Sequence, residues 1–373
     1  MTSCKINVFF SATSYPRSQN DWQGLFIKNI LSALAEDPNL SLKLWAPDGP
    51  RPISVDYDCS SSDQAFLKQL TNKGGIANLL RTQKILGVRS GLTLLNRLYK
   101  AYRRNSPWAS IYHINWFQNA LPLLRLRKHS IITILGTDFK LLSTPGMVYA
   151  LRKVLQTNNC ILAPNAEWME RPLEKIFGNH CEIITVPFGV DDMWYQIKRH
   201  NSASAKRWLV VSRITADKMG YLFDWGGELF ADSEHELHLF GPNQENLLIP
   251  SWVKYHGPTT ANELSQRWFP NASGLVTLSQ HSEGRPQVML EAMASGLPII
   301  ASDVPAHRDF IRHKHTGYCV KDAANFKSAI EWVSEPANNE LLSENSRNFA
   351  KVSYGTWRDC AKRYINLYQK LIV

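Results

Sequence analysis

The chain has 373 residues, of which 44% are hydrophobic and 20% are charged. This length predicts about two domains, and the composition excludes disorder and fibrous repeats as the main organisation. No stretch reaches the ~18 uninterrupted apolar residues of a membrane-spanning helix. The first ten residues do not resemble a signal peptide, and six scattered cysteines without a Cys-x-x-Cys pair predict reduced thiols in a cytosolic protein.

The formal net charge of +10 is unevenly distributed. The stretch from Gln64 to Thr137 contains twelve Lys or Arg and no Asp or Glu, so the remainder of the chain carries −2. A field of this sign attracts anionic surfaces or substrates. Nucleic acid is not an expected partner, because no nucleic-acid-binding motif accompanies the charge.

Within this basic stretch, one helical face is predicted to be apolar, while Arg97, Lys100 and Arg104 lie off that face. Such a helix can rest on an anionic membrane surface, with long basic side chains reaching the lipid headgroups. The alternative is a core-facing helix with a solvated basic edge. The residues of the apolar face are Leu92, Leu95, Tyr99 and Tyr102.

Short apolar runs alternate with amphipathic helical segments, such as 25–35 and 147–156, along the whole chain. This rhythm predicts α/β architecture with parallel sheets covered on both faces. The expected strands are 6–10, 42–46, 111–114, 131–135, 160–163, 183–186, 208–211, 236–240, 253–255, 274–277, 298–301 and 317–320.

The alternation pauses at 187–191 and through the polar stretch 198–206, then restarts with a strand at Trp208. We therefore expect one domain over 1–188 and a second over 189–355, with the last helix, about 356–373, packing back on the first. Doubly wound sheets bind ligands at the carboxyl ends of their strands. An interdomain cleft is accordingly the expected site.

The most informative segment runs from His281 to Pro298 and reads as a loop, a helix from about Pro286, and a Gly stop. The free N–H groups and the dipole of a helix start favour an anion such as a diphosphate. Glu283 precedes the helix and Glu291 lies about one and a half turns inside it, so the two carboxylates can hold two parts of one ligand. Carboxylates suit hydroxyl-rich ligands because each accepts several hydrogen bonds.

This segment resembles the Glu-x7-Glu signature of retaining GT-B glycosyltransferases, most closely glycosyltransferase family 4. The run Glu-Gly-x-Pro-x-x-x-Leu-Glu-Ala-Met-Ala-x-Gly-x-Pro-Ile is matched throughout. The resemblance implies two Rossmann-like domains and a nucleotide-sugar donor, with Glu283 on the transferred sugar and Glu291 on the ribose. It also implies donor contacts from Gly284, Arg285, Pro286, Gln287 and Val288.

Further donor-site residues follow from the same resemblance. Arg213 and Lys218 resemble the two cations that the family places on the donor diphosphate, where they offset the charge of the leaving group. The family usually has Gly directly after that Lys, whereas Met219 intervenes here before Gly220. Gly241, Gly257 and Gly24 resemble the family's glycine turns near the nucleotide and the phosphates.

In the first domain the resemblance is weaker and concerns the acceptor side. His113 and Asn115 lie at the end of one strand and Asn165 follows another, and all three are expected to line the acceptor. Many relatives carry His before Gly136, where this chain has Leu135, so the chain resembles the branch with an apolar residue followed by Gly-Ser/Thr-Asp. Asp138 is then the candidate polar group near the sugar, counted with Glu283, Arg213 and Lys218 as catalytic.

The function implied is retaining transfer of a sugar from a UDP- or GDP-sugar to a saccharide, with the leaving phosphate assisting deprotonation of the acceptor. No metal and no cofactor are expected. The basic first domain favours a lipid-linked acceptor, in bacterial O-antigen, capsule or exopolysaccharide synthesis, at the inner face of the membrane. Two alternatives remain: a nucleotide-sugar 2-epimerase of the same fold, and a non-catalytic polyanion-binding protein.

Overall fold

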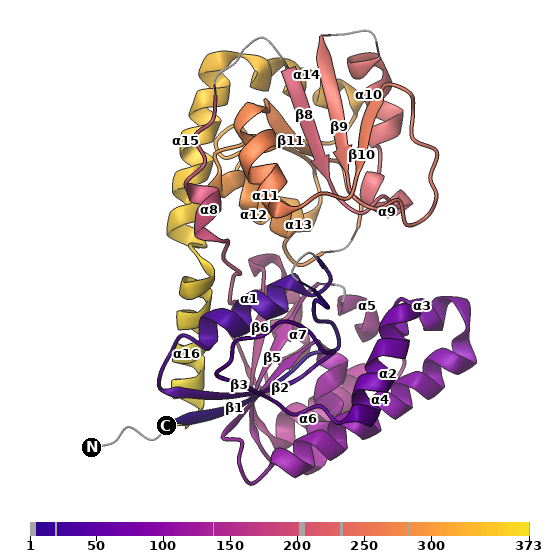
Figure 1. The fold of residues 1–373 in the computed structure, drawn as a ribbon, viewed down its shortest axis with the longest axis vertical. Helices are drawn as coiled ribbons and strands as arrows, with labels where there is room; N and C mark the ends of the chain where they lie inside the picture. Colours follow the sequence, from indigo (N-terminus) through magenta and orange to yellow (C-terminus); the bar gives the residue numbers. More distant parts are fainter. Residues whose placement is uncertain are drawn as a thin grey trace. The chain divides into compact units, whose positions relative to one another are not determined.

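The computed structural model describes residues 5–18, 21–136, 138–200, 206–231, 234–281 and 283–372. Contacts within the chain divide it into two compact units (Figure 1). Unit 1 comprises Met1–Pro187 together with Trp357–Val373, and unit 2 comprises Phe188–Thr356. The last helix therefore belongs to the unit that contains the beginning of the chain.

Unit 1 is built on a seven-stranded parallel sheet of order β3-β2-β1-β4-β5-β6-β7. Every strand predicted in this half is present, and β3 is an additional strand whose three residues are too few to show a pattern. The strands are β1 (Ile6–Ser11), β2 (Leu40–Trp45), β3 (Val55–Tyr57), β4 (Ile111–Asn115), β5 (His129–Ile134), β6 (Asn159–Pro164) and β7 (Glu182–Ile183).

Helices cover both faces of this sheet. On one face α1 (Leu25–Leu34) packs against α16 (Trp357–Ile372), whose predicted apolar stripe is buried. On the other lie α4 (Lys84–Asn105), the 3-10 helix η1 (Phe117–Arg125) and α6 (Met147–Thr157). The remaining helices are α2 (Ser61–Asn72), α3 (Gly75–Thr82), α5 (Phe139–Leu142), η2 (Glu167–Met169) and α7 (Glu170–Phe177).

Unit 2 is built on a six-stranded parallel sheet of order β10-β9-β8-β11-β12-β13, which contains all the strands predicted in this half. These are β8 (Lys206–Val211), β9 (His235–Phe240), β10 (Val253–Gly257), β11 (Gly274–Thr277), β12 (Ile299–Ser302) and β13 (Tyr318–Val320). The two sheets share one architecture, with helices on both faces, as the alternation predicted.

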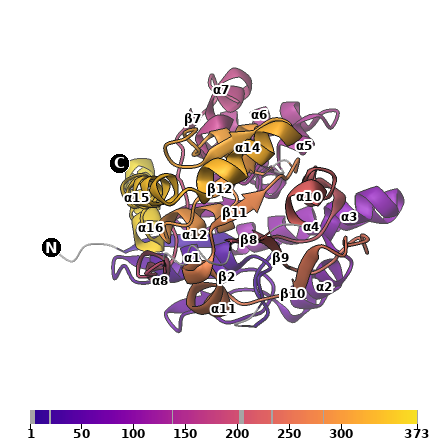
Figure 2. The ribbon, with the colours of Figure 1, turned by 90° about the horizontal axis from the view of Figure 1, so that it is seen from above.

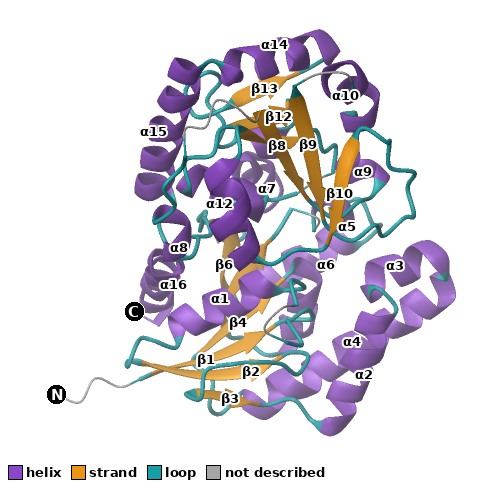
Figure 3. Cartoon of the chain, turned by 45° about the horizontal axis from the view of Figure 1, so that its top comes forward, coloured by secondary structure: helices purple, strands orange, loops and turns teal. Residues whose placement is uncertain are grey.

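In unit 2, α10 and α14 lie on one face of the sheet, while α8, α12 and α15 pack together on the other (Figures 2 and 3). The helical segments are α8 (Asp192–Tyr195), α9 (Ala216–Met219), α10 (Leu222–Phe230), α11 (Ala261–Glu263), η3 (Leu264–Trp268), η4 (Phe269–Asn271), α12 (Gln287–Ala294), α13 (Pro305–Arg308), α14 (Ala323–Ser334) and α15 (Pro336–Ser353).

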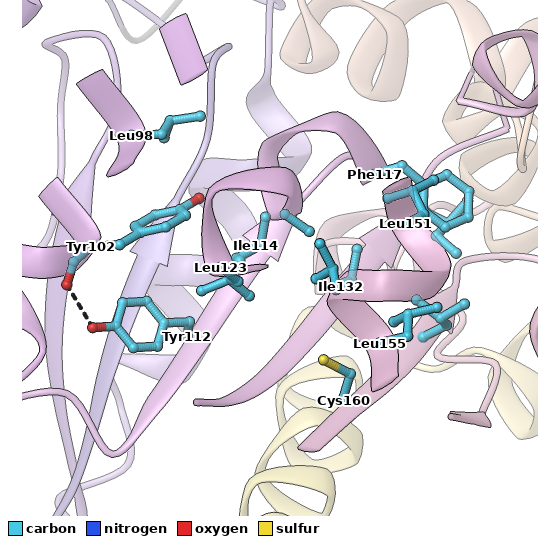
Figure 4. Close-up of a cluster of buried hydrophobic side chains, with 14 of the residues drawn as sticks. Leu98, Tyr102, Tyr112, Ile114, Phe117, Leu123, Ile132, Leu151, Leu155 and Cys160 are labelled. Carbon is cyan, nitrogen blue, oxygen red and sulfur yellow. Dashed lines mark hydrogen bonds between the residues drawn. The ribbon is translucent and has the colours of Figure 1, made fainter. Parts of the chain in front are cut away.

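The buried face of α4 differs from the predicted one. Leu98 and Tyr102 are fully buried in the core of unit 1, and the Tyr112 hydroxyl donates a hydrogen bond of 2.8 Å to the Tyr102 carbonyl (Figure 4). Leu92, predicted on the same face as Tyr102, is 64% exposed. The face of α4 that enters the core of unit 1 is thus rotated from the predicted stripe, because it packs against the aromatic side chains of the sheet.

Among the described helices, none is both long enough and apolar enough to cross a bilayer.

His113 is a core residue, which corrects its predicted place at the acceptor. Its side chain is fully buried, with Nδ1 2.5 Å from the Tyr368 hydroxyl and Nε2 2.9 Å from Thr133 Oγ1. Burial lowers the pKa of His113 to about 3, so the ring is neutral. The inward direction follows from the strand alternation of β4, which places His113 on the face covered by α16.

Candidate functional site

The carboxyl ends of β8, β9 and β11 hold the candidate site in unit 2. The Ile214 N–H donates to the Pro242 carbonyl at 2.9 Å, which joins the loops after β8 and β9. The Gln280 N–H donates to the Asp217 carbonyl at 2.8 Å, which joins the loop after β11 to α9. These bonds position Arg213, Lys218, Gly241 and Glu283 at one edge of the sheet, where doubly wound folds bind ligands.

Lys218 and Glu283 form an ion pair in this part of unit 2. Their side chains are only 13% and 17% exposed. Burial, and next the positive charge of Arg213, lower the pKa of Lys218 to about 7. The Glu283 carboxylate acts in the opposite direction, because a neighbouring negative charge favours the protonated amine. The pair therefore brings together one cation and one carboxylate, as a diphosphate joined to a sugar requires.

The extra residue Met219 has a structural explanation. Its side chain is 2% exposed and belongs to the core of unit 2. Gly220 follows with φ +51°, and a Cβ there would come within 2.0 Å of the Leu278 carbonyl oxygen. Thr215 begins this short helix by accepting a hydrogen bond from the Lys218 N–H. Met219 is therefore accommodated in the core of unit 2, while Lys218 stays on the turn that Thr215 caps.

Arg213 lies just beyond β8, beside two side chains from the loop after β9. Its Nη1 donates to Gln244 Oε1 at 3.5 Å. Burial lowers the pKa of the guanidinium, whereas the Glu245 carboxylate raises it. Arg213 and Lys218 are close enough to influence each other's charge, so the two predicted cations lie in one electrostatic environment.

Gly241 and Gly257 occupy turns that favour glycine. Gly241 has φ +133°, and a Cβ there would lie 1.8 Å from the Ser212 carbonyl oxygen. Its N–H donates to the Gly257 carbonyl at 2.8 Å. Gly257 has φ +74° with open space around its missing Cβ. Both turns therefore favour glycine because of their positive φ. At Gly241, close packing against the loop that carries Arg213 is a second reason.

Replacing Gly241 by Ala is expected to lower the free energy of unfolding by more than about 2 kcal/mol, because the added methyl displaces the Ser212 carbonyl. The same displacement moves the Arg213 loop and weakens nucleotide binding. Chemical denaturation and a UDP titration measure the two effects. The matched control is Gly257→Ala, where no atom meets the new methyl and only the positive φ is strained. Equal stability losses in the two variants would contradict the steric argument.

Helix α12 carries the second acid of the signature. It begins at Gln287 after Pro286, and the Gln287 amide donates to the Gly189 carbonyl at 2.9 Å. Val288 lies in the same first turn and is partly exposed. Gly284, just before this helix, is buried in the loop that carries Glu283. The predicted helix start is confirmed, and no side chain of the described residues caps the N–H groups of its first turn.

Glu291 lies in the second turn of α12. Burial, and next the charge of Asp191, raise the pKa of Glu291 to about 8. The free protein therefore holds this carboxyl group protonated at neutral pH. A polar ligand that hydrogen-bonds the carboxylate would favour its ionised form, which couples ligand binding to proton release.

Replacing Glu291 by Gln is expected to stabilise the protein in alkaline solution. The pKa of Glu291 is about 8 in the folded state and 4.5 without burial, so the unfolded state loses its proton first as pH rises. Wild-type stability relative to the variant therefore falls from about pH 4.5 to about 8 and is constant above. Thermal unfolding across this range measures the difference, with Glu331→Gln on the exposed surface of α14 as control. A pH-independent difference would contradict the raised pKa.

Arg285 is buried, which corrects its predicted contact with the donor. Its guanidinium forms an ion pair with Asp309, and their side chains are 1% and 4% exposed. The guanidinium also lies 4.5 Å from the centroid of the Tyr354 ring. Arg285 thus anchors the segment before α12 to the interior of unit 2, and its side chain is engaged there.

The predicted residues of unit 1 lie at the carboxyl ends of its strands. Asn115, which ends β4, and Asn165, just after β6, are 0% and 3% exposed, and Oδ1 of each has no hydrogen-bond partner among the described residues. Asp138 accepts a hydrogen bond from the Phe117 N–H at 3.3 Å. Buried unpaired amide oxygens are acceptors that a hydroxyl or water would satisfy. Their place in an acceptor site remains a prediction.

Gly24 begins α1 with φ +72°, and a Cβ there would lie 2.8 Å from the Ser14 carbonyl carbon and the Tyr15 nitrogen. The turn after β1 therefore needs glycine for its own packing. Leu135 is half-buried and precedes Gly136, whose φ is +87°. Thr137 lies outside the described residues.

No motif of the sequence singles out a hydrogen-bonded chain of residues behind the site. Ser302, which ends β12, donates to the Ser279 carbonyl at 2.6 Å, and Ser279 Oγ accepts from the His281 N–H at 3.1 Å. His307 Nδ1 lies 2.9 Å from the Ser302 carbonyl. Burial lowers the pKa of His307 to about 4. These hydrogen bonds hold the loop that carries Glu283. The only feature of the sequence that points to them is a Ser directly after a predicted strand.

Among the described residues, no cluster of His, Cys, Asp or Glu is suited to hold a metal ion.

The fold is that of GT-B glycosyltransferases, which confirms the predicted α/β class. A sucrose-phosphate synthase from Thermosynechococcus elongatus superposes with a TM-score of 0.75 at 16% identity, over 99% of each chain. A structure of HepE from Anabaena with UDP-glucose superposes with a TM-score of 0.68 at 11% identity, over 98% of this chain and 100% of that one.

Residues 205–335 match the family model described as "Glycosyl transferases group 1", so unit 2 carries a group 1 glycosyltransferase domain. The chain is 28% identical over 154 residues to spore coat protein SA of Bacillus subtilis (strain 168), which is 39% of this chain and 39% of that protein. The chain therefore matches well under half the length of this curated relative. The predicted family is confirmed for unit 2.

Proposed function

We propose that the chain is a retaining glycosyltransferase that moves a sugar from a nucleoside diphosphate sugar to a saccharide acceptor. The observation that carries the proposal is the grouping of Arg213, Lys218 and Glu283 at the carboxyl ends of the strands of a group 1 glycosyltransferase domain. Two cations suit a diphosphate, and a carboxylate beside them suits sugar hydroxyls.

In the proposed reaction the bond between the anomeric carbon and the diphosphate oxygen breaks, and the acceptor oxygen bonds to the same face of that carbon. The acceptor proton passes to the leaving phosphate. Arg213 and Lys218 stabilise the charge that develops on the diphosphate. Glu283 orients the sugar once the donor displaces it from Lys218, and Glu291 accepts hydrogen bonds from the ribose. No metal is assigned a role.

The proposed acceptor is a lipid-linked saccharide at an anionic membrane surface on the cytoplasmic side, in bacterial polysaccharide synthesis. One curated relative, 24% identical over 164 residues, is the Escherichia coli UDP-Gal:alpha-D-GlcNAc-diphosphoundecaprenol alpha-1,3-galactosyltransferase, whose name states a lipid-linked acceptor. These residues are 43% of this chain and 39% of that protein. The twelve cations between Gln64 and Thr137 give unit 1 the charge that such a surface attracts.

Calorimetric titration of the purified protein with UDP and with GDP tests the proposal. Binding of one nucleotide supports it, and binding of neither favours a non-catalytic polyanion-binding protein. A screen of nucleotide sugars without acceptor then separates two enzymes of this fold. A 2-epimerase would change the sugar of the donor by itself, whereas a transferase needs an acceptor.

A further inference from the structure

An exposed apolar stripe runs along the first half of α4. Ile85, Val88 and Leu92 are 75%, 54% and 64% exposed. Their spacing of three and four residues places them on one helical face, while Leu98 and Tyr102 on the other side of the helix enter the core. A contiguous exposed apolar surface on a folded unit marks an interaction site.

The stripe is displayed on a closely packed helical hairpin formed by α3 and α4. Gly87 makes this packing possible, because a Cβ there would lie 2.7 Å from the Leu80 backbone nitrogen. In Figures 1 and 3, α3 and the start of α4 lie at the end of their helical layer away from the sheet of unit 1. A largely apolar pocket of about 470 Å³ opens at this turn, and its lining includes Lys84, Ile85 and Arg89.

Exposed positive charges lie beside this stripe on α4 and on α2. Lys84 and Arg89 are exposed on the same turns of α4, and Lys68 and Lys73 are exposed on and just after α2. From Gln64 onward, α2, α3 and α4 contain no Asp or Glu. The stripe is therefore apolar at its centre and cationic at its margins.

Two arginines of α4 predicted to face headgroups are engaged elsewhere. Arg97 pairs with Asp63 at 2.7 Å, and Arg104 pairs with Asp58 at 3.0 Å. Both ion pairs lie in the second half of α4, where the helix packs on its own unit. Lys84 and Arg89, beside the exposed stripe in the first half of α4, form no ion pair among the described residues.

We infer that the α3–α4 hairpin docks on an anionic lipid surface through Ile85, Val88 and Leu92. Apolar side chains enter the boundary between headgroups and acyl chains, and Lys84 and Arg89 contact lipid phosphates. A second copy of the chain fits less well, because pairing two stripes would bring like charges together without an acid to offset them. This inference deepens the proposed function by naming the surface that reaches a lipid-linked acceptor.

Co-sedimentation of the full chain with vesicles tests the inference. Vesicles of phosphatidylcholine with about one third phosphatidylglycerol should retain the wild-type protein, and phosphatidylcholine alone should not. The variant I85S/V88S/L92S should bind at least ~10-fold more weakly, because it loses the apolar contribution. Lys84→Glu together with Arg89→Glu should have a similar effect, lessened at high salt.

Matched controls exist on unit 2. Val352 is 85% exposed on α15, so Val352→Ser removes an exposed apolar side chain elsewhere, and Lys327→Glu reverses an exposed charge on α14. Both controls should bind vesicles as wild type does. Equal binding of the triple variant and the wild type would overturn the inference. So would a wild-type dimer that the triple variant converts to a monomer, since a second copy would then cover the stripe.

Thermal unfolding of the triple variant separates lost docking from lost folding, and the exposed positions predict an unchanged transition. UDP titration of the same variant separates the two proposals. Unchanged UDP affinity with lost vesicle binding supports both. Wild-type protein that binds UDP but not the anionic vesicles would overturn the docking surface alone, and protein that binds vesicles but no nucleotide would overturn the proposed function alone.

Discussion

Glu283→Gln is expected to lower turnover by about 100-fold or more, because the amide cannot reproduce the charge that a carboxylate places beside the reacting sugar. Glu283 is largely buried and is paired with Lys218 in the free protein. Gln has nearly the same shape, and the fold should be preserved. Initial rates at saturating donor measure the loss, with the donor taken from the nucleotide-sugar screen.

The binding of UDP alone sharpens this expectation. UDP lacks the sugar, and the variant frees Lys218 from its carboxylate partner, so UDP should bind to Glu283→Gln at least as tightly as to wild type. Glu331→Gln, on the exposed side of α14, is the control and should leave both turnover and binding unchanged. Unaltered turnover in Glu283→Gln would remove the carboxylate from the proposed mechanism.

Lys218→Met is expected to weaken UDP binding by about 100-fold, which corresponds to roughly 2.7 kcal/mol. The amine lies on a capped turn, is 13% exposed, and shares its environment with Arg213. Loss of one of two cations leaves the diphosphate half neutralised in a poorly solvated place. Calorimetric titration with UDP measures the change.

The pH dependence of the same titration tests the electrostatic cause. The lowered pKa of about 7 implies that wild-type affinity for UDP falls as pH rises above this value, because the amine then loses its proton before binding. Lys218→Arg should remove that dependence and retain part of the affinity. Lys327→Met, on the exposed surface of α14, should behave as wild type. A Lys218→Met variant with wild-type affinity would show that the diphosphate is held elsewhere.

The sequence by itself determined the order of strands and helices. Apolar runs such as 274–277 are short and bounded by turn residues, so their periodicity depends only on neighbouring residues. The same holds for the start of α12 after Pro286 and for the buried stripe of α16. The group 1 signature around Glu283 and Glu291 could also be recognised from the sequence, because it lies in one continuous segment.

Only the tertiary structure decided which polar side chains remain available at the site. Arg285 belongs to the signature, yet it is buried against Asp309, and His113 follows the pattern of a strand end, yet it bonds to Tyr368 of the last helix. In each case the partner is distant in the chain. The exposed stripe of α4 was decided in the same way, because which face of a helix enters the core depends on the sheet it meets. Local periodicity specifies elements, whereas burial and pairing depend on contacts that the sequence brings together only when it folds.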